Sequence, residues 1–112
     1  MDAARLSARA AVAALEGRTD DAISGFREAL ARFRSVGEGF DVATTALDFV
    51  ILVGADHPAT REAAAEARAI FDRGRARPYL ERLDAALSGG ARSAATAVAQ
   101  SGSTVSSVTA TG

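Results

Sequence analysis

Several residue types that support chemistry are missing or rare in this sequence. Its 112 residues include no cysteine, no lysine and no tryptophan, and only one histidine, His57. Without cysteine the chain forms no disulfide and offers no thiolate as a nucleophile or metal ligand. Without lysine it has no phosphate-binding loop ending in Lys-Ser or Lys-Thr. A lone histidine before Pro58 is more typical of a cap or turn residue than of a general base or metal ligand, because no second ligand is spaced with it.

The charges are too evenly balanced to indicate a nucleic-acid partner. Thirteen arginines oppose fourteen carboxylates, which leaves a formal charge of −1 at pH 7 and no broad cationic field. Arg73, Arg75 and Arg77 form a small local cluster. We interpret it as a solvated helix C-terminus, where cations favour the helix dipole, in preference to an RNA contact, because no aromatic platform accompanies it.

No membrane segment is expected. The longest apolar run, Phe49 to Ala55, is far shorter than the roughly 20 residues that span a bilayer. The first residues place Arg5 and Arg9 among alanines and lack the apolar core of a secretory signal. The expected compartment is therefore the cytoplasm.

The most continuously apolar stretch runs from Phe40 to Gly54 and predicts a buried central helix. Apolar residues recur there at steps of three and four and also fill a second helical face. The alternative is a buried strand, because Phe49 to Val53 is rich in β-branched residues. A strand needs a partner, and the rest of the first 88 residues shows no clear alternation of period two. Asp48 is expected on a narrow polar edge of this helix together with Asp41, Thr44 and Thr45.

Amphipathic helices are predicted on both sides of this stretch. One is expected from Ala3 to about Glu16, with Asp2 as its cap and Gly17 as its left-handed stop. It is rich in alanine and should pack closely against a neighbour through small side chains. A second helix is expected to be capped by Thr19 and to end at Gly37. Gly25 lies inside it and should weaken it, unless it allows a close helix crossing.

The chain beyond the central stretch is expected to hold two more helices and a tail. A fourth helix is predicted from Ala59 to about Arg73, with Glu62, Glu66, Arg68 and Arg73 on a charged outer face. Pro78 opens a short fifth helix with Leu80, Leu83 and Leu87 as its apolar stripe. Residues 89–112, rich in Ala, Ser, Thr and Gly, predict a flexible tail, with a weak amphipathic helix over residues 91–100 as the alternative. The fold class is thus all-α, with about five helices in stacked antiparallel hairpins over residues 1–88.

Two helical hairpins in series resemble tetratricopeptide repeats. The turn from Gly17 to Ile23, followed by Phe26 and Ala29, is similar to the small, aromatic and small residues of that repeat, and Ala67 and Phe71 repeat the first two. The chain departs from the family pattern where Gly74 replaces the expected alanine and where the second unit is longer than the first. Ala10 and Ala13 also stand where the family has glycine and an aromatic residue.

A wider resemblance covers about residues 3–87. The run from Glu66 to Asp72, followed by Pro78 and the segment from Tyr79 to Leu87, is similar to the C-terminal end of large bacterial regulators. These proteins join an ATPase module and tetratricopeptide repeats to a class III nucleotidyl cyclase or a LuxR-type output domain. The resemblance implies a short repeat solenoid that acts as a protein-interaction or regulatory segment, with the catalytic domain elsewhere.

The expected function is therefore binding to protein. The carboxylate pairs Asp20 with Asp21 and Glu62 with Glu66 are accounted for by helix starts and surfaces, so no catalytic residue, metal or cofactor is expected. Because repeats bury their apolar faces on neighbours, the chain is interpreted as the terminal cap of a longer array or a truncated gene product, which meets an upstream repeat or another copy. The alternative is a free-standing adaptor or small-ligand sensor that binds in the cleft between hairpins. The candidate partner-binding residues are Ala4, Ala8, Ala11, Phe40, Asp41 and Asp48.

Overall fold

The structure is a computed structural model that describes residues 2–89, and all of its regular elements are helical. In chain order these are α1 (Ala3–Leu15), α2 (Thr19–Ser35), α3 (Gly39–Val53), the short 3₁₀ helix η1 (Pro58–Thr60), α4 (Arg61–Arg73) and a C-terminal helix over residues 77–89. This confirms the all-α fold class and rules out the alternative of a strand over residues 49–53. The tail predicted for residues 89–112 lies, from residue 90 onward, outside the described part of the chain.

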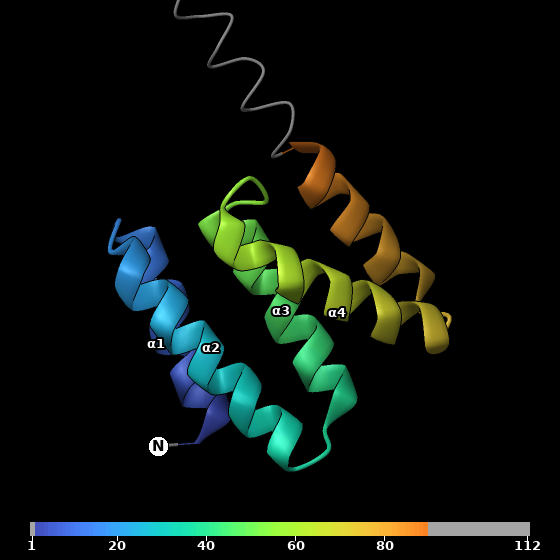
Figure 1. Cartoon of the computed structure of the whole chain (residues 1–112), viewed down its shortest axis with the longest axis horizontal. Helices are drawn as coiled ribbons and strands as arrows, with labels where there is room; N and C mark the ends of the chain where they lie inside the picture. Colours follow the sequence, from blue (N-terminus) through green and yellow to red (C-terminus); the bar gives the residue numbers. More distant parts are fainter. Residues whose placement is uncertain (1, 90–112) are drawn as a thin grey trace, which may run out of the picture.

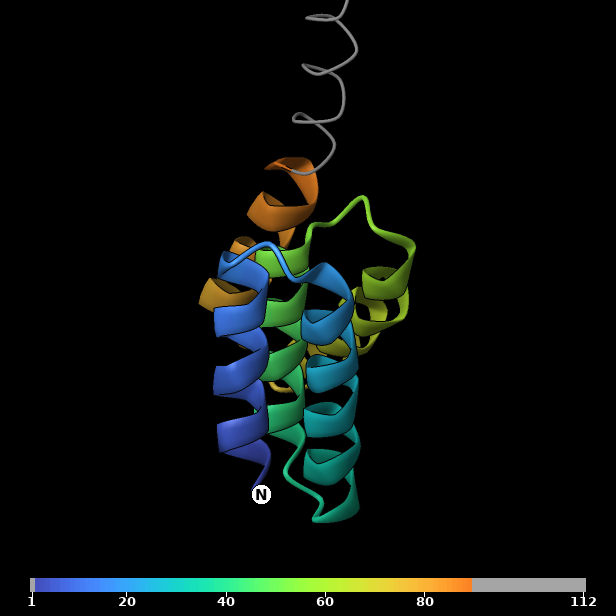
Figure 2. The same ribbon diagram turned by 90° about the vertical axis from the view of Figure 1, so that its left-hand side faces the viewer.

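The helices form hairpins that stack side by side around α3. Short turns join α1 to α2 and α3 to α4, so consecutive helices run antiparallel. α3 contacts α1, α2 and α4, and it lies between the first hairpin and the C-terminal helix (Figure 1). Seen from the side, α1 and α2 lie next to each other in front, with α3 behind them (Figure 2). The predicted central position of this helix is confirmed.

The helix ends of the first hairpin follow the sequence signals, with one exception. The Asp2 side chain accepts a hydrogen bond from the Arg5 amide at 2.9 Å, and Gly17 has a φ of +81°, as expected for a cap and a left-handed stop. The prediction that Thr19 caps α2 is wrong, because the helix already begins at Thr19 and Arg18 precedes it. The Arg18 guanidinium instead bridges Glu16 and Asp21 across the turn, with N–O distances of 2.6 and 3.1 Å.

The fourth helix begins later than predicted, because its first turn is tightened into η1. His57 Nδ1 accepts a hydrogen bond from the Ala59 amide at 3.0 Å, which confirms that His57 is a cap residue. The Thr60 hydroxyl is buried and lies 2.8 Å from the Gly54 carbonyl oxygen. These two side chains hold residues 57–60 in a 3₁₀ turn, so α4 starts at Arg61 instead of Ala59.

The core is built on α3. Its buried side chains include Leu47, Phe49 and Val50, and the Phe49 ring stacks on Phe26 of α2 with a centroid distance of 5.1 Å. Each large apolar side chain that is fully buried contributes about 1.5–3 kcal/mol to stability. The predicted polar edge is wrong for Thr45, which is buried, because neighbouring helices cover that side of α3 and the small threonine side chain fits there.

Two ion pairs join different helices, and the first of them joins helices that are not consecutive in the chain. Arg34 of α2 donates from Nε to Glu66 of α4 at 2.9 Å, and Arg68 of α4 pairs with Asp84 of the C-terminal helix. The sequence predicts only a charged outer face for Glu66 and Arg68, so these partners were missed. Because the pairs are solvent-exposed, each contributes no more than about 1 kcal/mol, and they orient the helices more than they stabilise them.

Gly25 of α2 marks the closest approach between the helices of the first hairpin. A β-carbon at this position would lie 2.9 Å from the β-carbon of Ala10 in α1. Real β-carbons do not approach so closely, and neither atom can rotate away. This confirms that Gly25 allows a close helix crossing.

We therefore expect Gly25→Ala to lower the free energy of unfolding by about 1–2 kcal/mol, although alanine is the better helix former by up to about 1 kcal/mol. Urea unfolding followed by circular dichroism measures the change. Gly39→Ala is the matched control, since a β-carbon there meets no atom within 4 Å, and it should be neutral or stabilising. The double variant with Gly25→Ala and Ala10→Gly should lose less unfolding free energy than the sum of the losses in the two single variants. Strictly additive losses would contradict the contact between the two helices at this crossing.

Candidate functional site

The outer side of α1 is apolar and exposed, and we call it the α1 face. It consists of Ala4, Ala8, Ala11, Val12 and Leu15. Leu15 is 76% exposed and Val12 is 50% exposed, while Ala10 and Ala13 on the other side of the helix are buried. α1 thus packs on its neighbours mainly through small residues, as predicted, and leaves two of its three large apolar side chains, Val12 and Leu15, in solvent. Of the predicted residues, Ala4 and Ala8 are exposed and Ala11 is partly covered by the core.

The other three predicted residues, Phe40, Asp41 and Asp48, all lie on α3. Phe40 is 52% exposed, and Asp48 is exposed two turns further along the helix. Asp41 is partly covered and faces Glu38, which precedes the helix. The structure therefore separates the candidate residues into two groups, one on the α1 face and one on the open side of α3.

An aromatic cluster surrounds Phe40. Its ring meets Phe71 of α4 and Tyr79 of the C-terminal helix edge-on, with centroid distances of 6.1 and 5.1 Å. The guanidinium carbon of Arg82 lies 5.6 Å from the centroid of the Tyr79 ring, within the range of a cation–π contact. One side of Phe40 is thus used to dock the C-terminal helix, and only the other side faces solvent. Sequence reasoning missed this cluster, because its members come from three helices.

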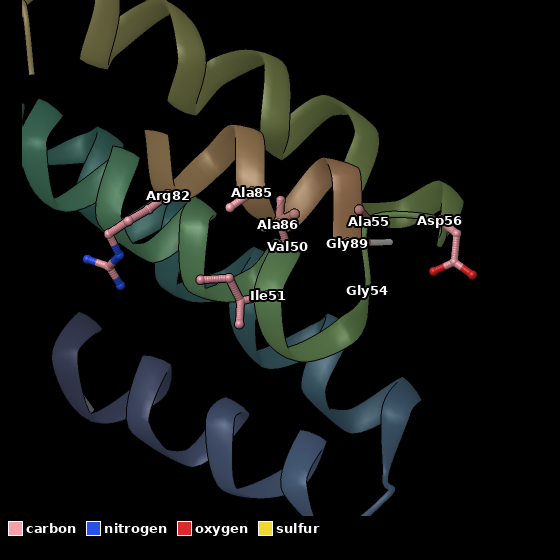
Figure 3. A pocket seen from close by; sticks show the side chains of 9 residues that line it. All are labelled: Val50, Ile51, Gly54, Ala55, Asp56, Arg82, Ala85, Ala86 and Gly89. Atoms are coloured by element: carbon pink, nitrogen blue, oxygen red, sulfur yellow. The ribbon is translucent and has the colours of Figure 1, made fainter. Parts of the chain in front are cut away.

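A groove of about 560 Å³ lies between the C-terminal half of α3 and the C-terminal helix, and we call it the α3 groove. Its lining is mainly aliphatic and small, with Val50, Ile51, Ala85 and Ala86, and Arg82 stands at one end (Figure 3). Ile51 is 46% exposed. The groove exists because alanines face α3 where larger residues would fill the space. The sequence signal for the groove was the pair of alanines, Ala85 and Ala86, that stands between Leu83 and Leu87.

Two carboxyl groups on the open side of α3 have shifted pKa values. Partial burial raises the pKa of Asp48 above its ordinary value of 3.8, and the positive charge of Arg82 opposes the shift. The pKa of Glu38 is raised by a side-chain hydrogen bond with Asp41 and by the negative charge of that residue. Within residues 2–89 no cation lies within ion-pair distance of Asp48 or Asp41. Asp48 and Asp41 thus form no ion pair with the described residues, and Arg82 is the cation that acts on Asp48 from a longer distance.

Neither a metal site nor a membrane-spanning helix is found within the part of the chain that the structure describes. Within residues 2–89, no group of three or more histidine and carboxylate side chains is arranged to hold a metal ion. The helices of the same region are all too short or too polar to cross a bilayer. Comparison of the chain with protein-family models, curated proteins and solved structures finds no match. The α1 face and the α3 groove are therefore the candidate binding surfaces of the described residues.

We expect Asp48→Asn to raise the free energy of unfolding at pH 7, by no more than about 0.5 kcal/mol, because Asp48 is partly exposed. The sign follows from the raised pKa of Asp48. Because the folded state binds the Asp48 proton more tightly than the unfolded state, ionisation of this group lowers the free energy of unfolding as the pH rises above about 3.8. The gain should vanish near pH 3, where the carboxyl is protonated in both states. Urea titrations at both pH values measure it.

The matched control for this substitution is Asp72→Asn, which replaces an exposed carboxylate on α4. It should bring no comparable gain at pH 7. A loss of stability in Asp48→Asn at pH 7 would show instead that the Asp48 carboxylate is held by an attractive partner.

Proposed function

We propose that the chain is a non-catalytic helical-repeat segment that binds another protein through the α1 face. The observation that carries the proposal is the exposure of Val12 and Leu15 on a helix whose other side is packed into the core. Large aliphatic side chains grouped on one helix face, beside alanines that allow close approach, are typical of an interface with a further helix. The proposal assigns no catalytic residue, metal or cofactor.

The architecture indicates what the α1 face meets. In stacked helical hairpins each unit buries its apolar side on the next, and an end unit that faces water needs a polar outer surface. The first hairpin does not have one at Val12 and Leu15. We therefore propose that α1 packs against a neighbouring hairpin, either an upstream repeat or a second copy of this chain.

The resemblance to tetratricopeptide repeats suggests a setting for this contact. It favours a terminal segment of a cytoplasmic signalling regulator, of the kind that couples an ATPase module to a class III nucleotidyl cyclase or a LuxR-type output domain. The segment would then contact other domains or proteins, and the catalytic residues would lie in another domain. The arrangement of antiparallel hairpins around a buried α3 supports a helical-repeat segment, and the setting itself rests on the resemblance alone.

A second candidate function is that of a free-standing adaptor or small-ligand sensor. The observation that favours it is the α3 groove, whose volume of about 560 Å³ falls within the range of about 300–1,000 Å³ typical of ligand-binding clefts. In this case the ligand would contact α3 and the C-terminal helix, and the α1 face would have no role. Substitutions on the two surfaces therefore separate the two functions.

We expect Leu15→Gln to weaken association at least tenfold while changing the free energy of unfolding by less than about 0.5 kcal/mol, because Leu15 is 76% exposed. Sedimentation velocity over a wide range of protein concentration measures self-association of the chain. If the gene encodes further repeats upstream, the same experiment with those repeats added measures binding to them.

Val36→Gln is the matched control, since Val36 is 66% exposed but follows α2, at the opposite end of the first hairpin from Leu15. It should leave association unchanged. A wild-type chain that stays monomeric at every concentration and is indifferent to the upstream repeats would contradict the proposal.

A further inference from the structure

The side chains of the α1 face change in size along the helix. The C-terminal half carries Val12 and Leu15, which are large and are 50% and 76% exposed. The N-terminal half carries only small side chains on this face, Ala4 and Ala8, which are also exposed. Ala4 and Leu15 are eleven residues apart, which is about three helical turns, so they lie on the same side of α1 near its two ends. The α1 face is therefore bulky at one end and flat at the other.

A second copy of the α1 face is complementary to the first when the two helices run in opposite directions. The large side chains of each copy then pack over the alanines of the other, and the distance between the helix axes stays even along the contact. Two parallel copies would instead set Leu15 against Leu15 and hold the alanine ends apart. The antiparallel pair thus removes the exposed aliphatic side chains of both copies from water.

The charges beside the α1 face favour the same direction. Arg5 and Glu16 each follow a residue of the face directly and are also eleven residues apart, so they stand along one edge of it at opposite ends. An antiparallel pair brings Arg5 of each copy to Glu16 of the other, which forms two symmetric ion pairs. A parallel pair would bring like charges to the same level.

Both charged groups are open to a partner. The Arg5 guanidinium lies 3.8 Å from the Asp2 carboxylate, too far for a hydrogen bond, and the Arg5 side chain is 79% exposed. Arg18 binds Glu16 through one oxygen, Oε1, with N–O distances of 2.6 and 3.1 Å. The other oxygen, Oε2, accepts no hydrogen bond within residues 2–89. A guanidinium of a second copy therefore binds Glu16 without displacing Arg18.

We propose that two copies of this chain associate through their α1 faces as an antiparallel, two-fold symmetric pair, in which Arg5 of each copy binds Glu16 of the other. The inference rests on the proposed function, which leaves an upstream repeat and a second copy open as partners, and it names the second copy. α1 is about 20 Å long, so the interface is smaller than that of a standard stable complex. The pair is therefore weak and reversible, and it forms at high protein concentration.

Disulfide cross-linking of the full-length chain tests the direction of the helices, because the chain has no cysteine of its own. The double variant with Ala4→Cys and Leu15→Cys should form a covalent dimer in a glutathione redox buffer, since the two kinds of thiol meet across the antiparallel pair. The two positions are about 17 Å apart within one copy, too far for a disulfide.

The two single-cysteine variants are the matched controls. Each should give at least tenfold less covalent dimer than the double variant, because like positions are also about 17 Å apart in the antiparallel pair. A covalent dimer of Leu15→Cys alone would show a parallel pair and would overturn the proposal. The same conclusion would follow if the double variant formed no more dimer than the single variants.

Charge reversal tests the two ion pairs. Arg5→Glu and Glu16→Arg should each raise the dissociation constant of the dimer about tenfold in sedimentation velocity, because each change opposes like charges at both ends of the pair. The double variant, in which the charges are exchanged, should return to within about threefold of the wild-type value. A double variant as weak as the single variants would contradict the pairing of Arg5 with Glu16.

The control for net charge is Arg73→Glu, which makes the same change as Arg5→Glu at an exposed position of α4. It should leave the dissociation constant unchanged, and circular dichroism should show that all of the variants remain folded. An equal loss of association in Arg73→Glu would show that overall charge, and not the α1 face, controls association.

Binding to other repeats distinguishes failure of this pair from failure of the proposed function. If the chain stays monomeric but binds repeats encoded upstream, and Leu15→Gln weakens that binding, the α1 face binds protein and only the second copy is the wrong partner. If the chain self-associates equally well in Leu15→Gln and in the charge variants, the dimer uses another surface, and both proposals are wrong.

Discussion

The burial of α3 is the constraint on which the rest of the structure depends. This helix is apolar on most sides, so it needs cover from several neighbours at once, and α1, α2, α4 and the C-terminal helix provide it. Aromatic contacts at two positions along α3, Phe49 and Phe40, hold these neighbouring helices in place. Phe49 stacks on Phe26 of the first hairpin, and Phe40 meets Phe71 and Tyr79 of the second unit and the C-terminal helix.

Most of the fold could be predicted from the sequence, because its signals are local. Asp2, Gly17 and Gly37 mark helix ends through their own conformations, and the apolar spacing marks which side of each helix is buried. The two wrongly predicted helix starts arose where another side chain changed the local structure. Arg18 bridged the turn at which Thr19 was expected as the cap, and Thr60 tightened the start of the fourth helix.

The candidate site could be predicted only in part. Helical spacing placed Asp48 on an exposed edge and Ala4 and Ala8 on a small-residue surface of the first helix, and all three residues are exposed in the structure. What spacing cannot show is which helices stand opposite one another. The α3 groove depends on the C-terminal helix placing Ala85 and Ala86 beside the C-terminal half of α3, and the ion pair of Arg34 with Glu66 depends on how α2 and α4 are placed relative to one another. Such pairings are set by tertiary packing between segments far apart in the chain.

The aromatic cluster at Tyr79 also determines how this molecule can be observed. The chain has one tyrosine and no tryptophan, so all of its intrinsic ultraviolet emission above that of phenylalanine arises where the C-terminal helix docks on Phe40 and Phe71. Emission therefore reports on that junction alone, whereas far-ultraviolet circular dichroism averages over every helix. Comparing the two signals during denaturation distinguishes a molecule that melts as one cooperative unit from one that sheds its last helix first.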